Sequence, residues 1–175
     1  MPYKILTLAE KDEWRLLIEK LPISQQDIYY TPEYYELYEK NGDGQAICFV
    51  FEKDKDIALY PFLINSVNDL GYELDDEYFD IQGAYGYNGV VSSNYKLSFR
   101  KNFYKTFYQY CLDQNIIAEF VRYNPMIGNH LFSENILDLQ INRKTIALNL
   151  EQSYDNIFST QFSSKNRNMI NKGEK

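Results

Sequence analysis

The stretch DIQGAYGYNG carries the residues of this chain whose types and spacing best suit a binding site. Gly83, Gly86 and Gly89 recur every third residue, and glycine permits positive φ angles and a close approach of the backbone to a ligand. Tyr85 and Tyr87 alternate with small residues, so both rings can project to one side of an extended segment. Such a wall can stack on a planar or sugar ring and offer two hydroxyls. A hairpin with half-buried tyrosines explains the same spacing, and the pattern alone leaves both interpretations open.

A second candidate is Arg122, which the sequence VRYNP places at the end of an apolar strand. Junctions between strands and loops often carry ligand-binding residues. A guanidinium group can bind a carboxylate or a phosphate through two parallel hydrogen bonds. An ordinary surface ion pair is the alternative.

Several other chemistries are not expected. His130 is the only histidine and lies in a polar segment with no nucleophile near it in sequence, so a Ser-His-Asp or Cys-His site is not indicated. Cys48 and Cys111 have neither metal spacing nor a disulfide framework. Phosphate-binding glycine loops of the GxxxxGK[ST] or GxGxxG type are absent. We therefore predict no metal site and name no catalytic residue.

An acidic run precedes the glycine-rich stretch and offers five carboxylates: Glu73, Asp75, Asp76, Glu77 and Asp80. Carboxylates bind hard cations such as Ca²⁺, but this run lacks the fixed ligand spacing of a calcium loop. A solvated loop that aids solubility is the simpler interpretation.

The net charge of −7 conceals an asymmetry. Residues 143–175 hold six basic and three acidic side chains, so the rest of the chain carries −10. An acidic body argues against DNA binding, whereas the basic tail can meet a phosphate or form a solvated helix face. No apolar window is long enough to span a membrane, and the N-terminus lacks the apolar core of a signal peptide. We therefore expect a cytoplasmic protein without a transmembrane segment.

Helical spacing and capping residues predict five helices. Thr31 and Pro32 give the second a capping hydroxyl and a proline at its first position, and Ser98 caps the third, in which Phe99, Phe103, Phe107 and Tyr110 form a buried stripe. The expected helices are residues 9–20, 32–41, 98–113, 154–160, and a basic helix that Ser163 or Ser164 caps and that ends at Gly173.

Apolar runs predict four strands. Residues 46–51 and 57–64 read as a hairpin, in which Pro61 suggests an edge position or a bulge. The other strands are residues 116–123 and 142–150. Because helices and strands interleave, we expect an α/β (α+β) fold with a mixed central sheet flanked by helices. The last helix has barely begun when the sequence stops, so we expect a truncated protein or an excised domain.

Several segments together resemble a known family. YYTPEYYELYE followed by AICFVFEKDKDIALYPFLI resembles the opening of acyltransferase-like proteins of the GNAT superfamily. YFDIQGAYGYNGVV resembles the YGYGG segment of its Fem-type branch, with Asn88 where a glycine is common, and AEFVRYNP resembles that branch's arginine-bearing strand and loop. NRKTIALNL and KNRNMINK resemble its following strand and its R-x-x-I-x-K helix. The resemblance covers roughly residues 27–175.

The resemblance implies a GNAT-like fold over residues 1–175 as a single domain, the N-terminal half of a longer two-domain protein. It also implies transfer of an acyl or aminoacyl group to an amine of a cell-envelope precursor, either peptidoglycan or an amino sugar. The partner would be a small-molecule or lipid-linked precursor. The donor would be acyl-CoA or an aminoacyl-tRNA, and tRNA would be met only as that donor. A non-catalytic module that binds a glycan or a peptide is the alternative.

The substrate-binding residues that follow from the resemblance and the spacing are Tyr85, Gly86, Tyr87, Arg122, Asn124, Lys165 and Arg167. Tyr85 and Tyr87 would line the acceptor cleft, Arg122 would anchor a carboxylate or phosphate, and the two basic tail residues would face a phosphate. The pyrophosphate loop of GNAT enzymes, [RQ]-x-x-G-x-[GA], is missing, and so is the helical arm associated with tRNA. We therefore expect no certain cofactor in this half.

Overall fold

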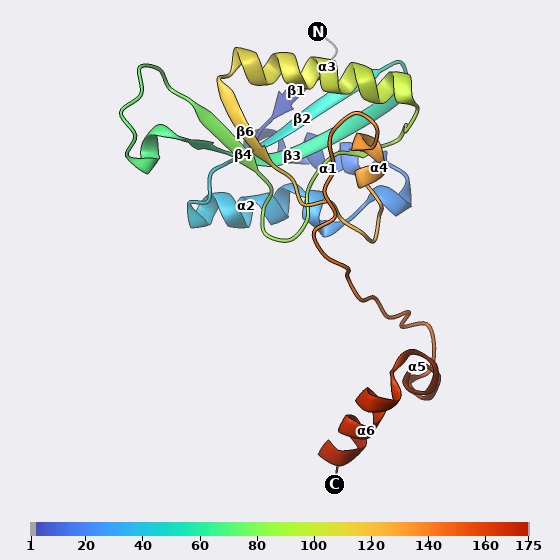
Figure 1. Cartoon of the computed structure of the whole chain (residues 1–175). Coiled ribbons are helices and arrows are strands. Elements are labelled where there is room, and N and C mark those ends of the chain that lie inside the picture. The colour runs from blue at the N-terminus through green and yellow to red at the C-terminus, as the bar shows by residue number, and fades with distance from the viewer. Residues whose placement is uncertain (1–2, 175) are drawn as a thin grey trace. The chain divides into compact units, whose positions relative to one another are not determined.

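The computed structural model describes residues 3–174, and its contacts divide the chain near Leu139 into two units. We call residues 3–139 the main body and residues 140–174 the helical unit. The main body is a mixed sheet with helices on both faces (Figure 1), which confirms the expected mixed α+β architecture. A single domain over residues 1–175 stays a prediction.

The sheet has the strand order β1-β2-β3-β4-β6, and the short β5 pairs with β3 beside this path. Neighbouring strands are antiparallel except for β4 and β6, which run parallel. The strands are β1 (Tyr3–Leu6), β2 (Gln45–Lys53), β3 (Asp56–Ser66), β4 (Phe79–Gln82), β5 (Val91–Ser92) and β6 (Ile116–Phe120). The hairpin of β2 and β3 is confirmed, whereas β1 and β4 were not anticipated because each is only four residues long.

The continuous apolar run of β2 arises because both faces of the sheet are covered. Cys48 and Val50 point to one core, while Ile47, Phe49 and Phe51 point to the other. Successive side chains of a strand alternate between faces. A strand buried on both sides therefore shows no polar positions, as in AICFVF.

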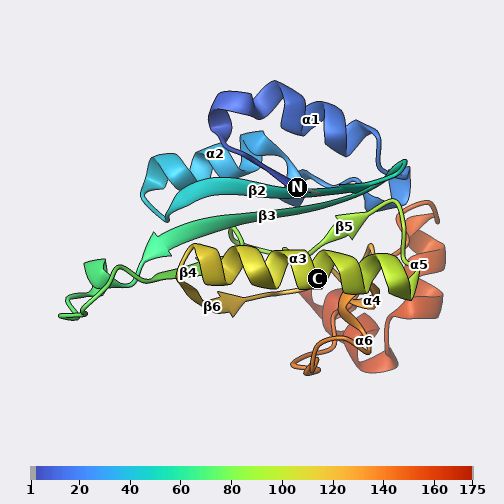
Figure 2. The same ribbon diagram turned by 90° about the horizontal axis from the view of Figure 1, so that it is seen from above.

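Helices α1 (Lys11–Glu19) and α2 (Pro32–Asn41) cover one face of the sheet (Figure 2). Trp14 is fully buried there, and its indole nitrogen donates a hydrogen bond to the carbonyl of Tyr30 at 2.9 Å. The predicted cap of α2 is confirmed, because the Thr31 hydroxyl accepts from the Tyr34 amide. The helix ends at Gly42 in a left-handed conformation with φ of 89°.

Helix α3 (Leu97–Asp113) covers the opposite face, together with the short α4 (His130–Ser133). Its buried stripe is the predicted one: Phe99, Phe103, Phe107 and Tyr110. The rings of Phe103 and Phe107 pack edge-on against Phe49, with centroids 5.6 and 5.1 Å away. The prediction that Ser98 caps this helix is wrong. The helix begins at Leu97, one residue before Ser98. Just before the helix, the side-chain oxygen of Asn94 accepts a hydrogen bond from the Lys96 amide and stabilises the turn that leads into it.

Pro61 was expected at an edge position or a bulge, and the edge position is wrong. It lies inside β3, opposite Cys48 of β2. On its other side, β5 pairs with β3 at Ala58 and Leu59, and β4 pairs with it from Leu63 onward. Pro61 therefore occupies the gap between two neighbours, where a missing amide hydrogen costs no ladder bond. Its carbonyl accepts a hydrogen bond from the buried Tyr35 hydroxyl at 2.9 Å.

The strand expected at residues 142–150 is also wrong. This segment has no regular secondary structure, and Ile146 is 94% exposed. An apolar alternation forms a strand only where another strand supplies hydrogen bonds, and none of the described strands pairs with it. The strand expected at residues 116–123 is shorter than predicted and ends at Phe120.

The helical unit contains α5 (Tyr154–Gln161) and α6 (Ser164–Gly173), as expected. The hydroxyl of Ser163 accepts from the Asn166 amide, so Ser163 rather than Ser164 is the cap. Among the helices of residues 3–174, none combines the length and the apolar character needed to cross a bilayer.

The aromatic packing under α3 predicts a large effect of one truncation. Replacing Phe103 by alanine should lower the free energy of unfolding by about 3–5 kcal/mol, because the ring is fully buried. Tyr108→Ala on the same helix is the matched control, since its ring is 66% exposed. Urea unfolding followed by circular dichroism measures both. Equal effects of the two substitutions would contradict the assigned face of α3.

Candidate functional site

The glycine-rich stretch forms a loop after β4 that packs against the segment before α2. Gly86 and Gly89 have φ angles of +107° and +95°, which side chains rarely adopt. A Cβ atom at Gly86 would lie 2.4 Å from Cε1 of Tyr29. Glycine is therefore required at this position both for the backbone angle and for the contact with the Tyr29 ring.

Five tyrosines meet around this loop, and we call them the tyrosine surface: Tyr29, Tyr34, Tyr38, Tyr85 and Tyr87. The ring of Tyr29 packs edge-on against Tyr34 and Tyr87, with centroids 5.3 Å apart in both pairs. The rings of Tyr34 and Tyr38 are 5.2 Å apart. Tyr85 is 75% exposed and Tyr87 is half-buried. The structure thus brings both predicted tyrosines together with three that were not predicted.

Tyr34 holds the loop to α2. Its hydroxyl donates to the backbone carbonyl of Tyr85 at 2.6 Å and lies 3.2 Å from the hydroxyl of Tyr38. Burial, followed by the hydrogen bond to Tyr38, raises the pKa of Tyr34 well above its usual value. The hydroxyl therefore stays protonated and remains a donor at every physiological pH.

Asn88 fixes the other end of the loop to β6. Its backbone amide donates to the carbonyl of Arg122 at 2.8 Å, and its side-chain oxygen accepts from the backbone amide of Arg122 at 2.6 Å. Its side-chain nitrogen donates to the carbonyl of Phe120 at 3.2 Å. The last two of these bonds need a side-chain amide, which accounts for asparagine where the family that this segment resembles commonly has glycine.

The predicted residues Arg122 and Asn124 differ in accessibility. Arg122 is exposed, and its guanidinium carbon lies 5.9 Å from the centroid of the Phe120 ring. Asn124 is buried, donates to the carboxylate of Asp27 at 3.1 Å and accepts from the Met126 amide. Arg122 can therefore contact a ligand directly. The side chain of Asn124 already forms the hydrogen bonds to Asp27 and Met126 that stabilise its own turn.

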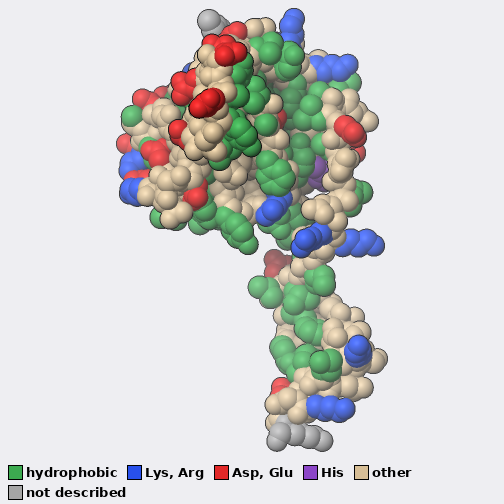
Figure 3. Space-filling model, turned by 60° about the vertical axis from the view of Figure 1, so that its left-hand side comes forward, with side chains coloured by type: hydrophobic (Ala, Val, Ile, Leu, Met, Phe, Trp, Pro, Cys, Tyr) green, Lys and Arg blue, Asp and Glu red, His purple; other side chains and the backbone are tan. Residues whose placement is uncertain are grey.

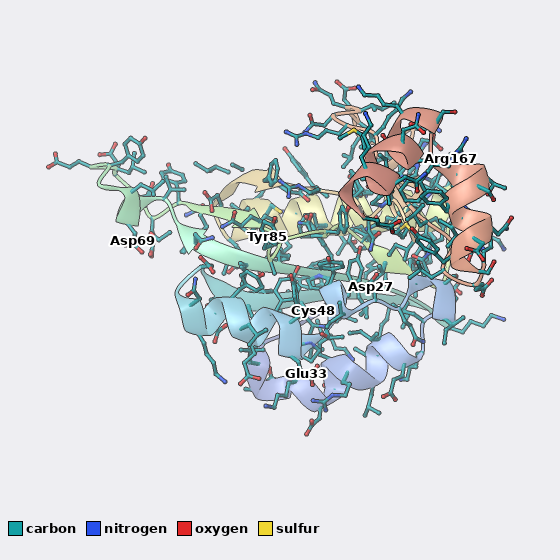
Figure 4. The ribbon with its side chains drawn as sticks, turned by 90° about the horizontal axis from the view of Figure 1, so that it is seen from below. Asp27, Glu33, Cys48, Asp69, Tyr85 and Arg167 are labelled. Carbon is teal, nitrogen blue, oxygen red and sulfur yellow. The ribbon has the colours of Figure 1, made fainter. Side chains whose placement is uncertain are left out.

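Lys165 and Arg167 lie on α6 of the helical unit. Lys165 is exposed. Arg167 donates to the carbonyls of Ser159 and Phe162, at 3.0 and 2.5 Å, and so satisfies the C-terminal end of α5. Its guanidinium stabilises the turn between the two helices, a role that the basic composition of the segment did not reveal. Figure 4 labels Arg167.

The main body has an open cavity of about 520 Å³ beside the parallel strands β4 and β6. Gln82 and Phe120, the last residues of these parallel strands, both line it. Its walls come from four segments: Gly42 and Asp43; Asn65, Ser66, Asp69 and Leu70; Asp80, Ile81 and Gln82; and Ala118, Glu119 and Phe120. Three of the lining residues, Asp43, Asp69 and Asp80, are aspartates, and the lining contains no lysine or arginine. The fourth acidic residue, Glu119, turns its carboxylate to Tyr60 on the other face of the sheet.

The strand register identifies the side chains on the floor of this cavity. Asp80 pairs with Ala118 and Gln82 with Phe120, while Ile81 points into the core beneath α3. Because side chains alternate, Asp80, Gln82 and Phe120 project from the opposite face, the one that carries α2. Asn65 pairs with Asp80 across the strands, and its side-chain nitrogen is buried without a hydrogen-bond partner. Figure 3 shows acidic side chains gathered on the visible face of the main body, with hydrophobic ones among them.

None of the five tyrosines lines the cavity, but residues of the cavity wall lie close to two of them in sequence. The amide of Asp43, in the cavity wall, donates to the carbonyl of Tyr38 at 3.0 Å. On the β4 side, Gln82 precedes Tyr85 by three residues. Figure 4 looks onto this side and shows Tyr85 over the sheet, with Asp69 out in the projecting loop between β3 and β4.

The acidic run that was considered as a cation site is divided between the projecting loop and the cavity. Glu73, Asp75, Asp76 and Glu77 lie exposed in the projecting loop, whereas Asp80 lies on β4 in the cavity. Within residues 3–174, no group of three or more His, Cys, Asp or Glu side chains is arranged to hold a metal ion.

Glu119 belongs to a separate polar cluster on the face that carries α3. It lies on an edge strand and keeps exposed surface, but its carboxylate accepts a hydrogen bond from the fully buried Tyr60 hydroxyl at 2.5 Å. Nearby, the hydroxyls of Tyr104 and Tyr123 share the hydroxyl of Ser133, at 2.5 and 2.8 Å. Burial raises the pKa of Glu119, and the bond from Tyr60 opposes that rise. A glutamate inside the apolar run IIAEFV was a signal of this cluster that sequence reasoning did not use.

Comparisons with known proteins gave no match, whether with family models, with curated proteins or with solved structures. The GNAT and Fem-type resemblance therefore rests on the sequence motifs described above.

The close contact at Gly86 predicts the effect of adding one methyl group. Gly86→Ala should destabilise the protein by more than Gly71→Ala, because the new Cβ meets the Tyr29 ring. Gly71 is the matched control, since its φ of +87° imposes a similar backbone cost, about 1–2 kcal/mol, in open space. Thermal unfolding measures both variants. A Gly86→Ala variant no less stable than Gly71→Ala would contradict the packing of this loop on Tyr29.

The raised pKa of Glu119 predicts that the free energy of unfolding depends on pH. Because this pKa is higher in the folded than in the unfolded chain, protonation stabilises the folded state below the unfolded pKa, and that contribution is lost as pH rises through the folded pKa. Glu119→Gln removes the titrating carboxyl group, so this variant does not lose that contribution to stability as the pH rises. The free energy of unfolding of Glu119→Gln, relative to wild type, should therefore rise as the pH increases from about 4 to 7.

Urea unfolding at intervals of half a pH unit measures that difference. Tyr60→Phe removes the bond that favours the carboxylate, so in this variant the loss of stability should extend to higher pH than in wild type. A difference between wild type and Glu119→Gln that stays constant with pH would refute the assignment.

Proposed function

We propose that this chain is a GNAT-like domain that transfers an acyl or aminoacyl group to an amine of a cell-envelope precursor. The observation that supports it most is the carboxylate-lined cavity beside β4 and β6. A lining with carboxylates and no basic side chain favours a cationic ligand, and an amine arrives at neutral pH as an ammonium ion.

Asp80 is the carboxylate best placed to act on that ammonium. It is half-buried on the floor of the cavity, and no ion pair with a described lysine or arginine occupies it. Acyl transfer requires the free amine, so a carboxylate that binds the ammonium must also accept its proton. The amine nitrogen then forms a bond to the acyl carbon, and the bond between that carbon and the donor's sulfur or oxygen breaks. The departing group takes up a proton.

The donor in this proposal is an acyl-CoA or an aminoacyl-tRNA. Arg122 is an exposed cation two residues after Phe120 of the cavity wall, and it would bind a phosphate of the donor or of a lipid-linked acceptor. The protein would act in the cytoplasm, where both donors are made.

A non-catalytic module that binds a glycan or a peptide is the second candidate. The tyrosine surface favours it, because exposed and half-buried phenol rings can bind a sugar without any chemistry. The missing pyrophosphate loop also favours it, since backbone amides at a helix start usually hold the phosphates of coenzyme A.

Transfer itself distinguishes the two candidates. The chain should acylate a peptidoglycan precursor or an amino sugar when supplied with acetyl-CoA or glycyl-tRNA, with the product detected by mass spectrometry. Asp80→Asn should reduce the rate about 10²-fold or more, the range of general-base catalysis. Asp113→Asn, an exposed carboxylate at the end of α3, is the control and should leave the rate unchanged. Binding of the acceptor without product from either donor would favour the binding module.

A further inference from the structure

We infer that the outer side of helix α3 docks on an anionic lipid surface, with its lysines against the lipid phosphates and its apolar side chains in the headgroup layer. Five exposed residues make up this side, and we call them the outer stripe of α3: Leu97, Lys101, Lys105, Tyr108 and Leu112. The outer stripe is a surface apart from the cavity and the tyrosine surface, so the inference does not depend on the proposed function.

The first argument is the position of the outer stripe on the helix. Its members recur every three or four residues, so they lie on one side of an α-helix. The core stripe of α3 follows four of them at a distance of two residues: Phe99, Phe103, Phe107 and Tyr110. Two residues correspond to about 200° around a helix, so the outer stripe points away from the core. Figure 2 looks onto α3 from this side, and no other element of the main body lies over it.

The second argument is the charge of the outer stripe. Among the described residues, Lys101 and Lys105 take part in none of the ion pairs. By contrast, every lysine and arginine within β1, α1 and α2 pairs with a carboxylate: Lys4, Lys11, Arg15 and Lys40. The only acidic residue of α3 is Asp113, at its end. The two lysines can therefore bind anionic headgroups without first breaking an ion pair.

The third argument is the apolar content of the outer stripe. Leu97, Tyr108 and Leu112 are 45%, 66% and 53% exposed. The phosphates of a nucleic acid cannot cover two leucines, whereas the membrane interface takes up leucine and tyrosine side chains beside its headgroups. Lysine can lay its aliphatic stem along an apolar surface while its ammonium group stays at the level of the phosphates. The mixture therefore favours a lipid surface over a nucleic acid.

The fourth argument concerns shape and the acidic remainder of the chain. From Leu97 to Leu112 the outer stripe runs straight for about 22 Å, which fits a flat surface. The carboxylates of α1 and α2 do not cancel the attraction, because these helices cover the opposite face of the sheet (Figure 1). At physiological ionic strength, charges farther from the lipid than about 8 Å are largely screened.

Flotation of the wild-type chain with lipid vesicles tests the inference. The probes are vesicles of equal parts phosphatidylglycerol and phosphatidylcholine, vesicles of phosphatidylcholine alone, and a single-stranded RNA. The partition coefficient on the anionic vesicles should exceed that on the neutral vesicles at least tenfold. It should fall when the salt concentration rises from about 0.1 M to about 1 M. Equal binding to both kinds of vesicle, or binding to neither, would overturn the inference.

Charge-reversal variants locate the binding. Lys101→Glu/Lys105→Glu should weaken binding to the anionic vesicles at least tenfold, since each lysine near such a surface contributes about fivefold. Lys20→Glu/Lys40→Glu is the matched control, because it changes the net charge equally at exposed lysines of α2 and of the end of α1. Equal losses in the two double variants would show an effect of net charge alone and would overturn the assignment to α3.

Apolar variants test the other half of the outer stripe. Tyr108→Ala/Leu112→Ala should weaken vesicle binding about fivefold or more, because these side chains enter the headgroup layer. Leu16→Ala/Leu37→Ala removes exposed leucines of α1 and α2 and should change nothing. Circular dichroism shows whether each variant is folded. Unchanged vesicle binding in Tyr108→Ala/Leu112→Ala would overturn the apolar contact with lipid.

The RNA probe separates the two anionic partners. The wild-type chain should bind the anionic vesicles and not the RNA. RNA binding that is lost in Lys101→Glu/Lys105→Glu, without binding to the anionic vesicles, would assign the outer stripe to nucleic acid and overturn the inference.

Discussion

Asn88 forms three hydrogen bonds to the end of β6, and the candidate site depends on them. They tie the glycine-rich loop to Arg122 and Phe120, at the point where the parallel strands β4 and β6 end. Buried polar groups that are left unpaired cost more than a formed hydrogen bond gains, so the loop has one favourable position. In that position the ring of Tyr87 packs against Tyr29, and the carbonyl of Tyr85 accepts from the Tyr34 hydroxyl.

A buried network extends this constraint into the core. The side chain of Asn129 donates to the carbonyl of Asn88 at 2.8 Å and to the hydroxyl of Tyr30 at 3.0 Å, and it accepts from the Asn124 amide. Tyr30 in turn accepts the indole hydrogen of Trp14 through its carbonyl. The loop is therefore connected to the core beneath α1 and α2, and a change in this core would reach the tyrosine surface.

The sequence predicts the long elements well because their patterns are strong. The stripe of Phe99, Phe103 and Phe107 and the cap at Thr31 identify two helices, and the central hairpin follows from its apolar runs. Short strands such as β1 and β4 escape prediction, since four residues hold too little pattern. Residues 142–150 show the converse error, in which an alternating pattern has no strand beside it.

The candidate site was predicted in part. The spacing of glycine and tyrosine pointed to the loop and to Tyr85, but not to the partners from α2, because contacts distant in sequence leave no periodic signal. Asp80 was noticed only as one carboxylate of an acidic run. Its position on β4, apart from the exposed loop, depends on a strand that the sequence does not reveal. Asn124 shows the opposite case, a predicted binding residue that the fold buries.

The central claim is that the carboxylate-lined cavity binds the amine of the acceptor. A crystal structure of the chain soaked with a glucosamine trimer tests it most directly. The account predicts an amine nitrogen within hydrogen-bond distance of the Asp43 or Asp80 carboxylate. A trimer bound elsewhere, or one whose amines point to solvent and away from the cavity, would contradict it.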